Sequence, residues 1–369
     1  MRGRTGMSLL LGVLLLSGVA ACVAVPAVGP TAGAAPTSPT TPTAPAGELR
    51  FTAAGDYGAT DDTGSVLETI RASDPDVHFA LGDLSYGRPG EEDQWCRFVT
   101  DRVGPDLPFQ LLPGNHESDG SNGAIAAFAE CLPNRLPGLV GSYPGQYYVD
   151  LPQGAPLVRF VMISPAITFP DGTWTYTAGS DRFAWTAAAI DGARSAGVPW
   201  VVVGMHKPCL STGVHSCDVG PDLLHLLVSE RVDLVISGHE HMYERTRQLD
   251  EGPGCPRITI GSFTPACVAD ADDALVAGAG TVFVTVGTGG TALRSTRRAD
   301  AEAPYFAAVS AANADPTHGV LDARATPTEL RLSFRRATGG TFTDAVAITR
   351  SGAPWALVPA DFVAGRTVP

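Results

Sequence analysis

The sequence has little positive charge and almost no lysine. Lys207 is the only lysine among 25 basic residues, which are set against 38 acidic ones for a formal net charge of -13. Because a nucleic-acid backbone binds a basic surface, this balance argues against a nucleic-acid partner. A substrate that carries phosphate would need local attraction, which bound cations could supply. Lys207 itself fits either a place near such a substrate or a solvent-facing loop.

The N-terminal apolar stretch is too short to span a membrane. Leu9–Val19 follows Arg2 and Arg4 and precedes small residues, a pattern typical of an export signal over residues 1–21. Val19-Ala-Ala-Cys22 resembles the lipobox of bacterial lipoproteins and predicts a lipid anchor at Cys22, with a freely secreted form as the alternative. Residues 22–47 are rich in Pro, Thr and Ala without apolar periodicity, so we expect a flexible tether there.

No Cys-x-x-Cys spacing is present, so a zinc site built from cysteines is not expected. Seven cysteines are an awkward number for an exported protein, but setting Cys22 aside leaves six. Six cysteines allow 15 pairings, and the sequence does not choose among them. We predict sequential pairing because each such pair closes a short loop; free thiols are the alternative. The six are Cys96, Cys131, Cys209, Cys217, Cys255 and Cys267.

Residues 48–350 are predicted to form one catalytic domain, followed by a tail at 351–369. With 44% hydrophobic and 17% charged residues, the chain is globular rather than disordered. Alternating strand-like and helix-like segments predict an α/β fold, and the β-rich part after residue 255 predicts a second sheet or an antiparallel extension. We expect strands at 49–54, 76–81, 108–112, 146–150, 157–163, 199–204, 232–236, 257–260, 281–286, 319–323, 329–334 and 345–349, and helices at 62–72, 91–102, 121–131, 181–196 and 221–230.

The segment Val232–Arg245, V-D-L-V-I-S-G-H-E-H-M-Y-E-R, joins an apolar strand to two histidines. His239 and His241 are two residues apart, so in extended backbone both side chains point the same way. Imidazole is a common metal ligand. The spacing therefore suits two adjacent metal ions.

Four other apolar runs end in the same way, in a glycine or short turn followed by a polar side chain. They deliver Asp56, Asp83, Asn115 and His206. In open α/β sheets, ligands bind beyond the carboxyl ends of the strands, where these side chains would converge. Carboxylates bind hard cations. Tyr86, three residues after Asp83, could share its metal, and a phenolate ligand indicates a strongly Lewis-acidic ion such as Fe(III).

Together these residues predict two metal sites that share a bridging carboxylate. Ions about 3.5–4 Å apart activate water and stabilise both the attacking and the leaving oxygen in phosphoryl transfer. The run Gly114-Asn-His116-Glu also places His116, a candidate proton donor, beside the candidate ligand Asn115. The predicted chemistry is metal-dependent hydrolysis of phosphate esters.

These motifs resemble those of the calcineurin-like metallophosphoesterases, and among them the purple acid phosphatases. All five family motifs occur in order over residues 56–245, and Val286–Gly290 and the run from His318 resemble the C-terminal part. The residues within the motifs are similar to those of the plant-type branch. Members of that branch carry an N-terminal β-sandwich domain, and we expect only the tether at that place here. The motifs are Gly-Asp56-x-Gly58, Gly-Asp83-x-x-Tyr86, Gly-Asn115-His116-Glu117, Gly204-Met205-His206 and Gly238-His239-Glu-His241-Met-Tyr243-Glu244-Arg245.

The resemblance implies a four-layer sandwich in which two mixed β-sheets are flanked by helices and the metal site lies at the carboxyl ends of the strands. It implies two metal ions, one typically Fe(III) and the other divalent, Fe, Zn or Mn. Asp83 would bridge them. The Fe(III) ligands would be Asp56, Tyr86 and His241, and the divalent ion would be held by Asn115, His206 and His239.

The other histidines receive different roles. The resemblance implies that His116 contacts the phosphate and protonates the leaving group; His215 lies where plant-type members carry further histidines and is the second candidate donor. We expect His78, inside a strand, and His225, inside a helix, to be structural. His318 is left unassigned. Tyr243, Glu244 and Arg245 are expected to orient the histidine loop rather than touch substrate.

We therefore predict an exported enzyme that hydrolyses phosphate monoesters by attack of metal-bound hydroxide, as an acid phosphatase does. Its partner would be a small phosphoester, and it would contact a membrane only through an anchor at Cys22. The oligomeric state is left open. The alternatives are a phosphodiesterase acting on nucleotide or lipid head-group diesters, and a surface lipoprotein that keeps the fold without catalysis.

Overall fold

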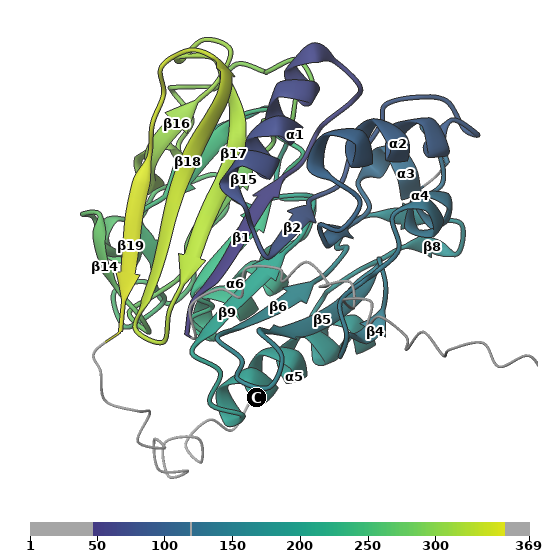
Figure 1. Cartoon of the computed structure of the whole chain (residues 1–369). Helices are drawn as coiled ribbons and strands as arrows, with labels where there is room; N and C mark the ends of the chain where they lie inside the picture. The colour runs from purple at the N-terminus through teal and green to yellow at the C-terminus, as the bar shows by residue number, and fades with distance from the viewer. Residues whose placement is uncertain (1–46, 119, 351–369) are drawn as a thin grey trace, which may run out of the picture. The chain divides into compact units, whose positions relative to one another are not determined.

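The computed structural model describes residues 47–118 and 120–350. The expected export signal, Cys22, the tether up to residue 46 and the tail at 351–369 lie outside these residues and stay predictions. The described part contains two large mixed β-sheets with helices on their outer faces (Figure 1). The predicted α/β fold of two mixed sheets flanked by helices is confirmed.

The first sheet joins N-terminal strands to C-terminal ones. Strands β1, β2 and β3 are parallel, whereas β17 pairs with β1 in the antiparallel direction and continues into the hairpin with β18. The N-terminal strand β1 and the C-terminal strand β17 therefore lie side by side (Figure 1). In order across the sheet, the strands are β14 (Ala274–Val276), β19 (Ala345–Thr349), β18 (Glu329–Gly339), β17 (Thr317–Ala325), β1 (Leu49–Ala54), β2 (Val77–Ala80) and β3 (Phe109–Leu111).

The second sheet is built from the middle of the chain. Its four central strands, β15, β10, β9 and β6, are parallel, and antiparallel strands flank them on both sides. In order across the sheet, the strands are β16 (Phe306–Ser310), β11 (Tyr243–Thr246), β15 (Val282–Val286), β10 (Leu234–Ser237), β9 (Trp200–Gly204), β6 (Val158–Met162), β5 (Gln146–Leu151) and β4 (Val140–Ser142).

The apolar run of β9 is buried on both of its faces. Trp200 and Val202 belong to the core that the two sheets share, whereas Val201 and Val203 pack with residues of α5 (Asp181–Ser195) and α6 (Pro221–Ser229). A parallel strand covered on both sides has no solvent face, so its sequence is continuously apolar rather than alternating. The run that predicted this strand is explained by that double cover.

Aromatic rings join the two sheets within their shared core. Phe160 of β6 lies with its ring centroid 4.9 Å from Phe51 of β1 and 4.4 Å from Phe79 of β2, so it joins the two sheets. Helix α1 (Asp61–Ser73) packs on β17 and β18, and Thr60 caps its first turn by accepting from the Thr63 amide. The remaining elements are α2 (Glu92–Val103), α3 (Asn115–Ser118), α4 (Ile125–Cys131), β7 (Thr168–Phe169), β8 (Gly172–Thr173), β12 (Gln248–Leu249), β13 (Val268–Asp270), and the 3-10 turns Pro265–Cys267 and Ala303–Tyr305.

The six cysteines of the described chain pair in sequential order, as predicted. The disulfides are Cys96–Cys131, Cys209–Cys217 and Cys255–Cys267. The first joins α2 to the end of α4, and the second closes a loop just after β9. This second loop carries His215.

The strand predicted at 257–260 is wrong. These residues belong to a loop that the Cys255–Cys267 disulfide closes. The Ile258 amide donates to Glu251 Oε1 at 2.9 Å instead of to a strand partner. The Ile258 side chain is nevertheless buried in the outer core, which is why the segment is apolar. Apolar character here reflects burial of a loop and not a β-ladder.

The helix predicted at 121–131 begins four residues later, at Ile125. The Ala124 amide donates to Glu92 Oε1 at 3.0 Å, and its backbone is extended. Asn122 uses its side chain to bind the turn after Asp83, through the Gly87 carbonyl at 2.8 Å. The contacts of Asn122 and Ala124 with residues outside the segment therefore replace the first turn of the predicted helix.

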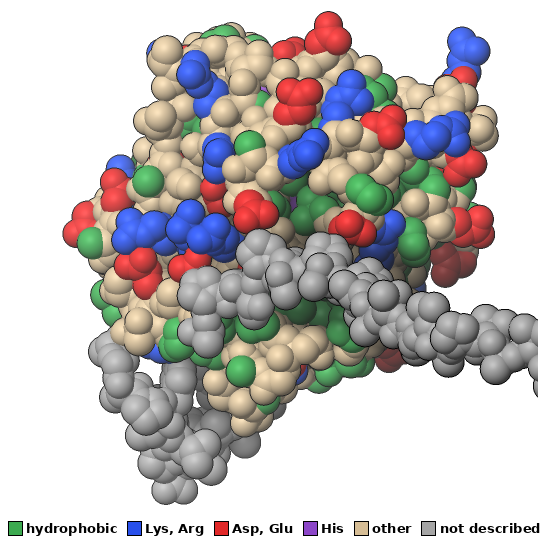
Figure 2. All heavy atoms as spheres, in the orientation of Figure 1, with side chains coloured by type: hydrophobic (Ala, Val, Ile, Leu, Met, Phe, Trp, Pro, Cys, Tyr) green, Lys and Arg blue, Asp and Glu red, His purple; other side chains and the backbone are tan. Residues whose placement is uncertain are grey.

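No helix in the described ranges is both long enough and apolar enough to cross a membrane. On the face drawn in Figure 2, acidic and basic side chains are interspersed and do not form one broad basic surface.

Replacing Phe160 by alanine is expected to lower the free energy of unfolding by about 3–5 kcal/mol, because it leaves a cavity between the sheets. Urea denaturation would measure the change. Val140→Ala, at a side chain that is 44% exposed, is the control and should stay within about 0.5 kcal/mol of the wild type. Equal effects of the two substitutions would contradict the assignment of Phe160 to the shared core.

Candidate metal centre

Several candidate ligands lie on strained turns that follow the strands. Asp56, Asp83 and His239 come after β1, β2 and β10 with φ values of 63°, 53° and 70°, and Tyr86 has a φ of 51°. Positive φ is unfavourable for residues other than glycine, and it persists where the surrounding contacts require it, often at functional sites. The four residues thus share a conformation that their own backbone preference does not explain.

Two glycines let neighbouring turns approach the carboxylates. A Cβ atom on Gly114 would lie 2.0 Å from Asp83 Oδ1, and one on Gly238 would lie 2.8 Å from Asp56 Oδ2. Both distances are shorter than a carbon–oxygen contact allows, so a side chain at either position would displace the carboxylate. The glycines that precede Asn115 and His239 are therefore required by close packing.

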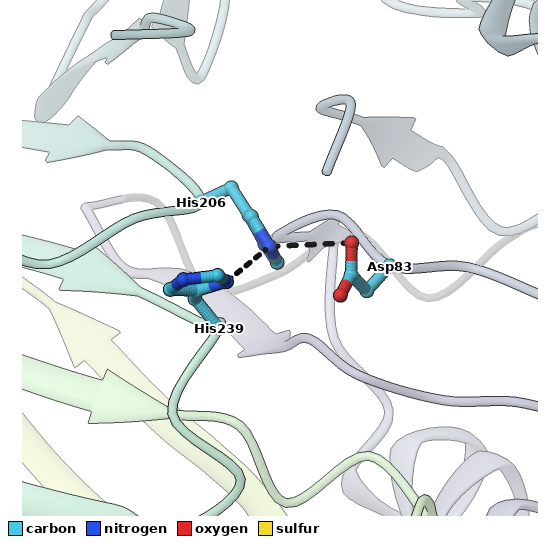
Figure 3. A group of neighbouring side chains, drawn as sticks. All are labelled: Asp83, His206 and His239. Carbon is cyan, nitrogen blue, oxygen red and sulfur yellow. Dashed lines mark hydrogen bonds and ion pairs between the residues drawn. The ribbon is translucent and has the colours of Figure 1, made fainter. Parts of the chain in front are cut away.

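Asp83, His206 and His239 form the first group of candidate ligands (Figure 3). His206 Nε2 lies 3.2 Å from Asp83 Oδ1 and 3.2 Å from His239 Nδ1. Asn115 Oδ1 lies 3.1 Å from the same nitrogen. Two imidazole nitrogens, a carboxylate oxygen and an amide oxygen thus surround one small volume.

Asp56, Tyr86 and His241 form the second group, again with Asp83. The Tyr86 hydroxyl lies 3.2 Å from Asp56 Oδ1, 3.1 Å from Asp83 Oδ2 and 3.1 Å from His241 Nε2. His241 Nε2 is also 3.5 Å from Asp56 Oδ1. A phenol, two carboxylates and an imidazole therefore converge beside the first group.

Asp83 is common to both groups. The ligand atoms of Asp83, His206 and His239 lie within 4.8 Å of one another, and so do those of Asp56, Asp83 and His241. One carboxylate oxygen of Asp83 faces His206 and the other faces Tyr86. The structure thus brings together the seven residues predicted as metal ligands, with Asp83 between the two groups.

Two of these histidines are held with Nε2 directed at the centre. His206 Nδ1 lies 2.7 Å from the Leu81 carbonyl, and His241 Nδ1 lies 3.0 Å from the Ala292 carbonyl. A carbonyl oxygen only accepts, so each Nδ1 carries hydrogen and Nε2 of the neutral ring presents a lone pair. A metal-binding imidazole is oriented in this way.

The buried charges call for cations. Burial raises the pKa of Asp56 to about 7. Burial acts against the charged form of His206, but Asp83 and Asp56 outweigh it and raise the pKa of His206 to about 9. Burial lowers the pKa of His239, and it lowers that of His241 to about 4. His239 Nε2 is buried and has no hydrogen-bond partner among the described residues. Carboxylates beside the neutral imidazoles of His239 and His241 fit a pair of metal ions, which would replace the proton that Asp83 and Asp56 favour on His206.

His116 lies at the edge of the centre on the Asp83 side. Its Nε2 is 3.6 Å from Asp83 Oδ2, and its ring centroid is 4.5 Å from that of Tyr86. Its Nδ1 is 2.6 Å from Asn122 Oδ1. Because the Asn122 amide nitrogen donates to the Gly87 carbonyl, Oδ1 faces His116 and Nδ1 carries hydrogen. Nε2, on a side chain that is 32% exposed, is left for a substrate.

His215 lies on the other flank, against His239. The two ring centroids are 4.1 Å apart. His215 Nε2 accepts from Arg294 Nη1 at 2.8 Å, and the His215 amide donates to Glu240 Oε1 at 2.6 Å. The structure therefore brings His215 to the centre, but with its Nε2 lone pair already engaged by an arginine.

The other predicted residues lie outside the two ligand groups. Lys207 pairs with Asp218 at 2.9 Å. Arg245 is buried and binds Asp344 at 2.7 Å, and Tyr243 donates to the same carboxylate at 2.7 Å. These contacts fix β11, directly after the histidine loop, as expected of side chains that orient it.

A family model described as Calcineurin-like phosphoesterase matches residues 49–243, which is more than half of the chain. The chain belongs to the calcineurin-like phosphoesterases. The match begins at β1, which delivers Asp56, and ends just after His241. The family resemblance inferred from the motifs is therefore confirmed.

The curated relatives of this phosphoesterase include plant purple acid phosphatases. Purple acid phosphatases 21 and 18 of Arabidopsis thaliana are 31% and 28% identical over 227 and 226 residues, covering 58% of this chain and 49% of each relative. Fe(3+)-Zn(2+) purple acid phosphatase 12 of the same plant is 26% identical over 259 residues, covering 65% of this chain and 50% of its own. The chain spans about half the length of the curated relatives it matches.

Solved structures share the fold of this phosphoesterase. A purple acid phosphatase from yellow lupin seeds, PPD1, superposes with a TM-score of 0.62 at 18% identity, covering 83% of this chain and 54% of that one. GAP50 of Plasmodium, described as the anchor in the inner membrane complex, gives 0.52 at 16% identity, covering 83% and 90%. Identities this low show the fold alone.

Glu117 is a residue whose role the motifs did not reveal. Its buried carboxylate accepts from the amides of Asp83 at 3.1 Å, Gly114 at 3.0 Å and Leu84 at 2.6 Å. Burial, followed by the charge of Asp83, raises the pKa of Glu117 to about 8. Glu117 therefore fixes the strained turn of the bridging Asp83. Its place in the Gly-Asn115-His-Glu117 motif was the available signal.

The segment after β15 holds the ligand turns from the other side. The Gly289 amide donates to the Gly55 carbonyl at 2.9 Å, and the Thr291 amide donates to the Asp56 carbonyl at 3.1 Å. The Arg294 amide donates to the His241 carbonyl at 2.9 Å. This 289–294 loop joins the turns of both sheets, a role that its glycine-rich sequence alone did not indicate.

Replacing Glu117 by glutamine is expected to weaken metal binding by about 10- to 100-fold, because one amide oxygen cannot replace the three contacts that hold the Asp83 turn. Metal titration followed by atomic-emission analysis would measure the loss. Glu130→Gln, at an exposed position on α4, is the matched control. Wild-type metal affinity in Glu117→Gln would show that the turn does not depend on this carboxylate.

Proposed function

We propose that this phosphoesterase hydrolyses phosphate monoesters at a centre of two metal ions, in the manner of an acid phosphatase. The observation that carries the proposal is the pair of ligand groups that share Asp83. Their donor atoms match the residues that the purple acid phosphatase motifs single out. The plant relatives named as purple acid phosphatases support the same choice.

The donor atoms of the two groups favour different ions. Asp56, Tyr86 and His241 offer two anionic oxygens when the phenol is ionised, which suits Fe(III). The other group combines two imidazoles with an amide oxygen and suits a divalent ion, Fe, Zn or Mn. A relative named as an Fe(3+)-Zn(2+) phosphatase supports such a mixed pair. When bound, the ions would bind and polarise the phosphate and activate water.

His116 is the proposed proton donor to the leaving group. Asn122 Oδ1 holds its Nδ1 hydrogen, so a protonated His116 keeps its second proton at Nε2, beside Asp83. A leaving alkoxide that receives this proton departs as a neutral alcohol. For this role the His116 ring must carry both protons before the leaving group departs.

His215 is proposed to bind substrate rather than to protonate it. Arg294 donates to His215 Nε2, so in the neutral ring the hydrogen is on Nδ1. Of the two histidines predicted as donors, His116 alone has Nε2 free of a donor contact among the described residues.

Full-length protein loaded with metal is expected to hydrolyse p-nitrophenyl phosphate faster at acid than at neutral pH, and faster than bis(p-nitrophenyl) phosphate. Chelation should remove this activity because the substrate loses the ions that hold its phosphate. Absorbance of released nitrophenol measures both rates. Preference for the diester would shift the assignment to a phosphodiesterase. No turnover of either ester would favour a surface protein without catalysis.

Asp83→Asn is expected to lower the rate at least about 100-fold, since loss of an outer contact to a metal ligand alone costs 10- to 100-fold. Circular dichroism would check that the fold is retained. Asp93→Asn, an exposed position on α2, supplies the same chemical change away from the centre. A fully active Asp83→Asn protein would contradict the dinuclear proposal.

Export and lipid anchoring are part of the same proposal. The mature chain is expected to begin at Cys22 and to carry lipid there, because the preceding residues resemble a lipobox. Mass spectrometry of the N-terminal peptide from the native host would test this, and Cys22→Ser should move the protein out of the membrane fraction. A lipid-free N-terminus at another residue would support the freely secreted alternative.

A further inference from the structure

Arg294 is a half-buried cation at the edge of the metal centre. Its Nη1 lies 2.8 Å from His215 Nε2 and 3.3 Å from the His239 carbonyl. His215 in turn stacks on His239, whose Nδ1 is 3.2 Å from His206 Nε2. The guanidinium is therefore one side chain removed from the candidate ligands of the divalent site.

The charge of Arg294 has no carboxylate partner within the described ranges. Two other buried guanidinium groups do have such partners: Arg159 binds Asp150 at 2.7 Å, and Arg245 binds Asp344 at 2.7 Å. The side-chain hydrogen bonds of Arg294 go to a neutral imidazole and a carbonyl, and both use Nη1. Its Nε–H and both Nη2 hydrogens remain for another acceptor.

The position of Arg294 is fixed by its backbone. Its amide donates to the His241 carbonyl at 2.9 Å, and its carbonyl accepts from the Ala312 amide at 2.8 Å. The side chain therefore starts from a rigid point of the 289–294 loop. A guanidinium held in this way pays little ordering entropy when an anion binds.

Arg294 and His116 lie beside different candidate ligands of the centre. Arg294 contacts the His239 carbonyl, whereas His116 Nε2 lies 3.6 Å from Asp83 Oδ2 and its ring packs on Tyr86. A phosphate held at the centre would thus have a proton donor on one flank and a fixed cation on the other.

We infer that Arg294 binds a phosphoryl oxygen that is free in a monoester and esterified in a diester, and that it thereby selects monoesters. This inference rests on the proposed function. A monoester carries up to two negative charges, because its second ionisation lies near pH 6, whereas a diester carries one. A guanidinium with unused donors gains a charge-assisted hydrogen bond from the additional free oxygen.

The test uses full-length, metal-loaded protein and three variants. Arg294→Gln removes the charge, and Arg294→Lys keeps it without the planar fork. Arg298→Gln is the matched control, because Arg298 is an exposed arginine of the neighbouring segment whose side chain donates to the Asn313 carbonyl at 3.2 Å. Metal content and melting temperature are measured for each variant, so that an effect on loading or folding is seen directly.

Two readouts are compared, calorimetric binding of inorganic phosphate and kcat/KM for p-nitrophenyl phosphate and its diester. Arg294→Gln is expected to weaken phosphate binding and monoester kcat/KM by about 10- to 100-fold, the range for a hydrogen bond to a charged group. Diester kcat/KM should change by less than about threefold, which is within 1 kcal/mol. Arg294→Lys should fall between, and Arg298→Gln should match the wild type.

The outcomes separate this inference from the proposed function. Monoester turnover that is unchanged in Arg294→Gln, or reduced equally for both esters, overturns the role of Arg294 and leaves the phosphatase proposal in place. Arg294-dependent phosphate binding without turnover of either ester supports Arg294 as the anion-binding residue and overturns the phosphatase proposal. Wild-type protein that binds no phosphate when loaded with metal overturns the inference.

Discussion

Two carboxylates buried where the two sheets meet are the constraint on which the rest of the site depends. Asp56 is 0% exposed and Asp83 1% exposed, and no arginine or lysine in the described chain pairs with either. Burying like charges without compensation is costly, and the raised pKa of Asp56 reflects that cost. Metal ions would supply the missing positive charge. The positive φ values and close-packed glycines are local costs of holding both carboxylates toward one point.

Many residues around the centre bind backbone groups of the ligand turns rather than the side chains of the ligands. Glu117 accepts from the amides on both sides of the Asp83 turn, and the 289–294 loop reaches the carbonyls of Asp56 and His241. Glu244 acts in the same way on the disulfide-closed loop, where it accepts from Thr212 at 2.8 Å. Because these contacts are to backbone groups, each would persist through small changes in the ligand side chains. The site is therefore rigid mainly through its turns, as a preorganised metal centre requires.

The sequence predicted those features that depend on residues close together in the chain. Doubly buried strands such as β9 are continuously apolar, so they and the polar residues after them were recognisable. Local rules failed where a side chain from outside the segment replaced a backbone partner: Glu251 accepts from the Ile258 amide, and Glu92 accepts from the Ala124 amide just before α4. Arg294 was missed for the same reason. The role of Arg294 depends on its contact with His215, which is 79 positions away in sequence and has no periodic relation to it.

The net charge of -13 does not prevent binding of an anionic substrate. Repulsion by the surface carboxylates and attraction at the centre act over different distances. At physiological ionic strength the Debye length is about 8 Å, so most surface carboxylates are screened from a phosphate at the centre. Arg294 and the bound ions would act within a few ångströms and in a partly buried setting, where screening is weak. A polyanion longer than the site would instead extend over a surface that has no broad basic area on the face drawn in Figure 2. The proposed binding of a small phosphoester therefore does not require a basic surface.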